Sequence, residues 1–154
     1  SKIALQTDSK ILIGGGFSTI NGNSISNFAR LNQDGTTDGT FNIGNGANNT
    51  VGSILVLPDN RICVGGSFSL FNGASRPSLV RLQSDGSLDS SFKPVRISSN
   101  INSIVQLPNQ KLLMMPVEAG ALIGSLAGIA EIAKESFGNR PAPTGRVPRT
   151  GGTP

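Results

Sequence analysis

Two copies of one pattern, separated by 51 residues, constrain the fold of this chain more than any other feature. Residues 11–18 return as 62–69 with the same order of apolar, glycine, phenylalanine and serine positions. Between Asp8 and Phe41, 15 of 34 positions are identical in the second copy. A period of roughly 40 to 50 residues, built from short apolar strands and glycine-containing turns, is typical of propeller-like arrays. The repeat therefore predicts a β-propeller-like architecture.

Each copy has the same internal order of strands and turns. An apolar strand is followed by a polar turn and a second apolar strand, which is the pattern of a β-hairpin. Asparagine-glycine and aspartate-glycine pairs then mark two further turns. The expected hairpin strands are 3–5 with 10–13, 53–57 with 61–64, and 103–107 with 111–114. We expect a repeat region over 1–114, with copies at about 3–53 and 54–103 and a partial third copy at 104–114.

The third copy departs from the pattern after Met114, because Met115-Pro116 stands where the glycine pair should be. The following segment is rich in alanine, leucine and isoleucine and predicts a glycine-striped apolar helix over 115–138. Residues 139–154 are rich in proline, glycine and arginine and predict an extended tail. The expected fold class is all-β blades, two repeats plus a partial third, followed by one C-terminal α-helix and the tail.

Small and large apolar residues alternate along the predicted helix in a way that favours close packing on a partner. Glycines at four-residue intervals share one helix face and allow another backbone to approach. The predicted packing residues are Gly120, Gly124, Gly128, Leu122, Leu126 and Ile129. The uninterrupted apolar run is shorter than the ~20 residues that span a bilayer. Membrane association through 117–137 is the alternative interpretation of this segment.

The tail carries three arginines and no acidic residue. Arg140, Arg146 and Arg149 predict contacts with a partner. No aromatic side chain accompanies them, so we do not expect a nucleic-acid partner. The partners that we expect are other subunits, or proteins of a virion or cell surface, contacted through the helix and tail.

Composition excludes several mechanisms. The chain has no histidine, so neither an imidazole base nor a Ser-His-Asp relay is available. Its one cysteine, Cys63, occupies a strand position where the first copy has Leu12, which predicts a buried apolar filler. Cysteine-histidine zinc sites are impossible with one cysteine. We predict no catalytic residue, no cofactor and no metal requirement.

The aspartates of the repeat invite a calcium hypothesis, but they lack the dense acidic series and closing glutamate of an EF-hand loop. A structural role is the preferred interpretation, because an aspartate in such a turn caps nearby amides. The shared spacing also predicts that Asp38 pairs with Arg30, and that Asp89 pairs with Arg81, as a contact that locks each blade. Two phenylalanine pairs keep the same offset and are expected at equivalent buried positions: Phe17 with Phe68, and Phe41 with Phe92.

Several fixed spacings together resemble a known repeat family. The pattern runs apolar-x-Pro-Asp-x-Lys/Arg-Ile-x-Val-Gly-Gly-x-Phe-Ser, then Asn-Gly, then Arg-Leu-x-x-Asp-Gly-x-x-Asp-x-x-Phe. It is similar to the delta-sixty repeat of bacterial and viral β-propeller proteins, and the resemblance covers 1 to about 114. It implies propeller blades on secreted, cell-surface or virion-associated proteins, and it supplies no catalytic residues.

These observations predict a non-enzymatic structural and attachment module at an extracellular, cell-surface or virion location. The blades would form an exposed knob, and the helix and tail would anchor it. Two blades and a fraction do not close a propeller, which has four to eight blades, so the blades are either completed by further sequence or shared between subunits of a homo-oligomer. A trimer would bring three pairs of blades together. The alternative is a ligand- or glycan-binding propeller module, although glycan sites usually use aromatic platforms and this chain offers only phenylalanine.

Overall fold

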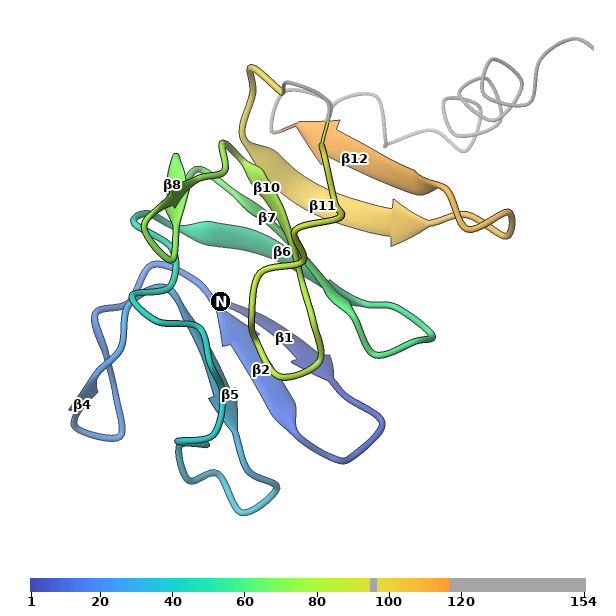
Figure 1. Ribbon diagram of the computed structural model, residues 1–154. Coiled ribbons are helices and arrows are strands. Elements are labelled where there is room, and N and C mark those ends of the chain that lie inside the picture. The colour runs from blue at the N-terminus through green and yellow to red at the C-terminus, as the bar shows by residue number, and fades with distance from the viewer. Residues whose placement is uncertain (95–96, 117–154) are drawn as a thin grey trace, which may run out of the picture. The chain divides into compact units, whose positions relative to one another are not determined.

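The computed structural model describes residues 1–94 and 97–116. Within them, three blade-like antiparallel sheets follow one another along the chain (Figure 1). The first blade is β1 (Lys2–Leu5), β2 (Ile11–Gly14) and β5 (Phe28–Leu31), in the order β1-β2-β5. The second blade is β6 (Val51–Val56), β7 (Ile62–Gly66) and β10 (Leu79–Leu82). The third blade is the hairpin of β11 (Ile101–Gln106) and β12 (Leu112–Pro116).

Two short hairpins connect the second and third strands of the first two blades. They are β3 (Thr19–Ile20) with β4 (Asn23–Ser24), and β8 (Leu70–Phe71) with β9 (Ala74–Ser75). Their turns are the asparagine-glycine pairs, and both residues of each pair have positive φ. Such turns match the twist of the flanking strands, and glycine adopts them without steric cost. The predicted turn chemistry is confirmed.

The three blades share one strand register. Ile3 pairs with Ile13 in the first blade, and Ile54 pairs with Val64 in the second. The third blade repeats this arrangement at an offset of 50 residues, because Ile104 pairs with Met114. Residues of the three hairpin turns that correspond to one another, Ser9, Asn60 and Gln110, have φ of 67°, 65° and 63°. The repeat in sequence is therefore a repeat in backbone conformation, as predicted.

Two hydrophobic clusters lie between neighbouring blades. The larger lies between the first and second blades and contains the edge-on pair Phe28 and Phe71, whose ring centroids are 5.9 Å apart. The smaller lies between the second and third blades and includes Cys63, Leu79 and Ile104. Alternate residues of a strand point to opposite faces, so the second blade, which lies between the other two, contributes to both clusters. Cys63 is fully buried there, as expected.

The first glycine of each Gly-Gly pair lets the next blade approach closely. A Cβ at Gly14 would overlap Cγ1 of Val51, and a Cβ at Gly65 would lie 2.6 Å from Cγ2 of Ile101. In the third blade the equivalent residue is Met115, since it pairs with Ser103 as Gly65 pairs with Ser53. A further blade placed against the third blade in the register that the first two blades use would therefore meet the Met115 side chain where they have a glycine.

The predicted fold class, blades followed by one C-terminal helix, is wrong for the part of the chain that the structure describes. Every regular element in that part is a β-strand. Met115 and Pro116, expected to start the helix, end β12 instead and pair with β11. The register of the hairpin overrides the local signal, and proline is tolerated at the end of a strand that pairs, among the described strands, with β11 alone. The rest of the predicted helix, and the tail, lie outside the described residues.

The predicted equivalence of two phenylalanine pairs is half right. Phe68 is 1% exposed and Phe41 is 9% exposed, so both belong to the core. Their equivalents, Phe17 and Phe92, are only half-buried. Phe68 packs in the cluster between the first and second blades, whereas Phe17 lies on the side of the first blade that no described blade covers. Burial depends on the neighbouring blade, which a comparison of two isolated repeats does not contain.

Candidate functional site

An ion-pair cluster holds the first blade together at its aspartate-glycine turn. The Arg30 Nε donates to Oδ2 of Asp38 at 2.8 Å, and Nζ of Lys10 lies 3.3 Å from the same oxygen. The backbone N–H and hydroxyl of Thr40 donate to Oδ1 of Asp38 at 3.0 and 2.6 Å. The carboxylate is 4% exposed and both of its oxygens are engaged. This satisfied carboxylate supports the fold and has no oxygen left over for a metal ion or a substrate.

The same arginine also ties the first blade to the second. The Arg30 Nη1 donates to the carbonyl oxygen of Ser84 at 2.7 Å, and its Cζ lies 4.3 Å from the ring centroid of Phe41. Next to it, the backbone N–H of Asn42 donates to the carbonyl oxygen of Asp85 at 2.7 Å. The aspartate-glycine turn of the second blade is therefore a docking point for the first blade.

The second blade repeats this cluster with more solvent around it. The Arg81 Nε donates to Oδ2 of Asp89 at 2.7 Å, and Nη1 of Arg61 lies 3.4 Å from that oxygen. The predicted pairing of arginine and aspartate in both copies is confirmed. The Arg81 side chain is 17% exposed, against 7% for Arg30. The second cluster is consequently the less buried of the two.

The electrostatics of both aspartates follow from these contacts. Burial acts to raise the pKa of Asp38, but the hydrogen bonds from Thr40 and Lys10 and the charge of Arg30 outweigh it and hold that pKa well below its usual range. Burial likewise acts on Asp89, where hydrogen bonds from Ser91 and Arg81 lower the pKa to about 2. Both side chains are therefore charged at neutral pH, and neither is suited to act as a general base near pH 7.

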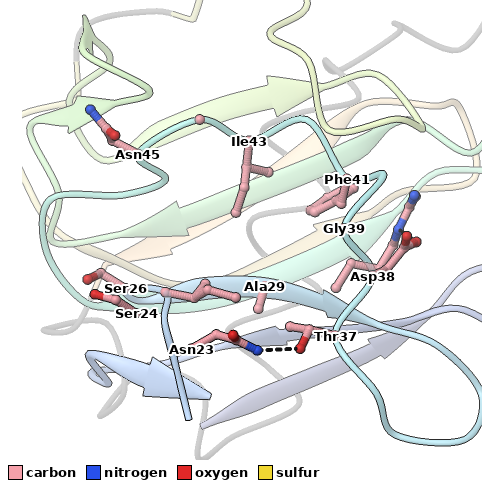
Figure 2. Close-up of a pocket in the computed structure, with 13 residues that line it drawn as sticks. Asn23, Ser24, Ser26, Ala29, Thr37, Asp38, Gly39, Phe41, Ile43 and Asn45 are labelled. Carbon is pink, nitrogen blue, oxygen red and sulfur yellow. Dashed lines mark hydrogen bonds and ion pairs between the residues drawn. The ribbon is translucent and has the colours of Figure 1, made fainter. Parts of the chain in front are cut away.

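A groove of about 700 Å³ lies beside this cluster in the first blade (Figure 2). Figure 2 shows Phe41 and Ile43 on the loop that faces Ala29 of β5. Asn23 Nδ2 donates to Oγ1 of Thr37 at 2.9 Å along one side. The lining is Asn23, Ser24, Ile25, Ser26, Ala29, Arg30, Thr37, Asp38, Gly39, Phe41, Ile43, Gly44 and Asn45. We call it the first groove; apart from the Arg30–Asp38 pair its lining is uncharged.

An equivalent groove of about 770 Å³ lies in the second blade. It is lined by Ser75, Arg76, Pro77, Ser90, Phe92, Lys93, Pro94, Ile97 and Ser98. Six of these positions match lining positions of the first groove at the offset of 51 residues, Phe92 matching Phe41 among them. Two positions change character: Arg76 stands where the first copy has Ile25, and Lys93 where it has Asn42. We call this cationic site the second groove.

One face of the first blade is apolar and exposed. Ile3 is 73% exposed and Leu5 is 66% exposed, whereas their equivalents in the second blade, Ile54 and Val56, pack against the core. Ile11 and Ile13 lie on the same face, which we call the outer face. In the second blade this face is covered by the first. Within the residues that the structure describes, no blade covers the outer face.

The residues singled out from the sequence for partner contacts all lie outside the described residues, so the structure brings none of them together. They are Gly120, Gly124, Gly128, Leu122, Leu126, Ile129, Arg140, Arg146 and Arg149. The two grooves were missed. The signal for the charge of the second groove lay in positions where the two copies differ, whereas the sequence comparison used the positions where the copies agree.

Other kinds of site can be checked within 1–94 and 97–116. No group of three or more aspartate, glutamate, cysteine or histidine side chains converges there as a metal site would require. In the same ranges, no helix has the length and apolar character needed to cross a bilayer.

Comparison with known families agrees with the fold. A family described as a domain of unknown function (DUF5122) beta-propeller matches residues 6–41 and 57–92. The match covers the larger part of each of the two complete repeats and supports a β-propeller repeat family. It does not single out the delta-sixty repeat. No solved structure matches the chain significantly.

Proposed function

We propose that this β-propeller repeat protein is a non-enzymatic structural and attachment module that associates with a second copy of itself. The delta-sixty family, a secreted, cell-surface or virion location, and contacts of the tail with other surface proteins belong to the same proposal. The observation that carries it is the outer face, with Ile3 and Leu5 exposed at 73% and 66%. Large apolar side chains gathered on one sheet face mark an interaction surface.

The established contacts between blades indicate how large the interaction can be. The same face of the second blade contributes Ile54, Val56, Ile62 and Val64 to a cluster of buried side chains. Covering the outer face of the first blade would therefore bury a comparable set of side chains. The hydrophobic effect favours that burial by about 25 cal/mol per Å² of apolar surface.

The arrangement of the two copies follows from the third blade. Stacking head to tail would require the third blade of one copy to cover the first blade of the next. Met115 obstructs this approach, because it occupies the position where Gly14 and Gly65 admit a neighbour. The outer faces of two copies can instead pack on each other around a two-fold axis, the commonest symmetry of homo-oligomers. We therefore propose a face-to-face dimer.

The state of the carboxylates supports a non-enzymatic role. Asp38 and Asp89 are held by cations and hydroxyl groups, and their pKa values are lowered. A catalytic acid or base acting near neutral pH would need a pKa close to 7. The chain also has no histidine to serve instead.

The two grooves favour a second candidate function, a ligand-binding module of the same fold. Each is a concave site of a size that suits a small ligand, and each combines polar groups with an apolar wall. The repeat presents the site twice, with different chemistry in each copy.

The dimer is tested by the mass of the full chain in solution, measured by light scattering at roughly 0.1 mM, where micromolar and tighter complexes are formed. We expect a dimer for the parent chain and a monomer for the variant Ile3→Ser/Leu5→Ser. The matched control is Val105→Ser, which changes an exposed side chain of the third blade. A monomeric parent would overturn self-association. A trimer, or dissociation by the Val105 variant, would overturn the face-to-face arrangement.

A further inference from the structure

We propose that the second groove binds an organic anion carrying sulfate or phosphate groups, through Arg76 and Lys93. This inference rests on the second candidate function and is independent of self-association. Both cations line the same cavity of about 770 Å³, together with three serine residues. Cationic and hydroxyl donors around one concave site are the groups that bind oxyanions.

The position of Arg76 is fixed by its backbone and by one side-chain contact. Its N–H donates to the carbonyl oxygen of Ser69 at 3.0 Å, and its Nη1 donates to the carbonyl oxygen of Ser75 at 2.9 Å. A guanidinium has five N–H donors, so this single side-chain contact leaves further donors for a ligand. The side chain is half-buried, which reduces the entropy lost when a ligand fixes it.

Within residues 1–94 and 97–116, the positive charge of the groove is not neutralised by a neighbouring carboxylate. No acidic residue is among its lining residues. The carboxylate of Asp89 is engaged by Arg81, Arg61 and Ser91. Among the described residues, Arg76 and Lys93 take part in none of the ion pairs. Two unpaired cations at one cavity attract an anion more strongly than cations already paired with acids.

The apolar lining residues of the groove are suited to the organic part of such a ligand. Phe92, Pro94 and Ile97 supply an apolar wall. Cζ of Arg81 lies 4.6 Å from the ring centroid of Phe92, so this arginine holds the ring in place. The site therefore combines cationic and hydroxyl donors with an apolar surface, as expected for a site that binds a sulfated or phosphorylated sugar.

The first groove is a control built into the same chain. It has nearly the same volume and keeps one serine and the phenylalanine, since Ser24 and Phe41 are equivalent to Ser75 and Phe92. With Ile25 and Asn42 in place of the two cations, it lacks unpaired charge. We therefore expect an anion to occupy the second groove and not the first.

The test is calorimetric titration of the full chain with sucrose octasulfate, a sulfated disaccharide, and separately with inorganic phosphate. We expect saturable binding of the disaccharide that weakens as salt is raised. The variant Arg76→Ile/Lys93→Asn places the residues of the first copy at these two positions. It should weaken binding about tenfold or more. Adding Ile25→Arg/Asn42→Lys to that variant should restore binding at the first groove. Binding of phosphate to the parent but not the disaccharide would overturn the sugar-sized ligand.

The control for net charge is Lys2→Asn/Lys111→Asn, which removes two cations that line neither of the two grooves. Its affinity should stay within about twofold of the parent, because long-range charge effects are screened by salt. Equal losses in both double variants would overturn the inference, since only net charge would then matter. Unchanged affinity in Arg76→Ile/Lys93→Asn would also overturn it. So would failure of the four-substitution chain to regain binding while its melting temperature stays near that of the parent.

Discussion

Ile3 of the first blade is 73% exposed, whereas Ile54, its equivalent in the second blade, packs against the core. The reverse holds at the ion-pair clusters, where Arg30 of the first blade is the more buried and Arg81 of the second the more exposed. The burial of a side chain therefore depends on which parts of the neighbouring blade lie against it. The comparison teaches that a repeat unit contributes only half of each interface, and that its neighbour decides the energetic value of a side chain.

The phenylalanine pair should show the largest difference between the blades. We expect Phe68→Ala to lower the free energy of unfolding by about 4 kcal/mol, because Phe68 is fully buried between two blades. Phe17→Ala should cost about 1 to 2 kcal/mol, since Phe17 is half-buried. Chemical denaturation of the two variants measures both values. Equal losses would show that burial by a neighbouring blade does not set the contribution.

The two aspartates at the arginine clusters should differ because their arginine partners differ in exposure, Arg30 being 7% and Arg81 17% exposed. Asp38→Asn leaves Arg30 and Lys10 without a counter-charge, and we expect a loss of about 3 kcal/mol in unfolding free energy. Asp89→Asn should cost about 1 to 2 kcal/mol, because Arg61 and Arg81 are more open to solvent. Denaturation at pH 7 compares them. A larger loss at Asp89 would contradict the ranking.

Acidic pH should reduce the folding stability of the chain by a smaller amount, through the carboxylates of Asp38 and Asp89. Both aspartates have lowered pKa values in the folded chain, so their contribution is fully present above the unfolded value near 3.8 and is lost as pH falls toward their folded values. We expect the melting temperature to fall between pH 4 and pH 2. The fall should be shallower in Asp38→Asn, which lacks one of these groups. An identical pH profile for parent and variant would exclude Asp38 as a source of the effect.

The turn aspartates should show the smallest effect and no difference between blades. Asp34 accepts hydrogen bonds from the N–H and hydroxyl of Thr36, and Asp85 accepts the same pair from Ser87. Replacing either aspartate by alanine should cost about 1 kcal/mol. Thermal melts of the two variants should agree. A clear difference would show that even local turn contacts depend on the neighbouring blade.

The sequence predicted the features that a single repeat contains. Strands, turns and the pairing of Arg30 with Asp38 depend on residues close along the chain, and the fixed offset of 51 residues repeats them. The hydrogen bond from Arg30 to Ser84 could not be predicted in this way, because it joins residues 54 positions apart in different blades. The fold-class error at Met115 has a similar origin, since pairing with Ser103 outweighed the local signal for a helix.

The candidate sites depended even more on context. The two grooves form where a turn, a hairpin and a loop meet, and no local pattern announces such a cavity. The change from Ile25 to Arg76 is visible in the aligned repeats, but its meaning requires knowing that both positions line a groove. Differences between otherwise matching repeats would have been the most useful sequence signal.

The thiol of Cys63 allows the opening of the interface between the second and third blades to be measured as a rate. Burial between the second and third blades raises the pKa of Cys63 to about 11, so the closed state offers neither access nor thiolate to an alkylating reagent. Modification must wait until those blades separate. Under fast labelling, the rate of thiol modification therefore equals the opening rate of that interface. The chain has no tryptophan or tyrosine to serve as a fluorescent reporter, and Cys63 is thus a natural chemical probe of local opening.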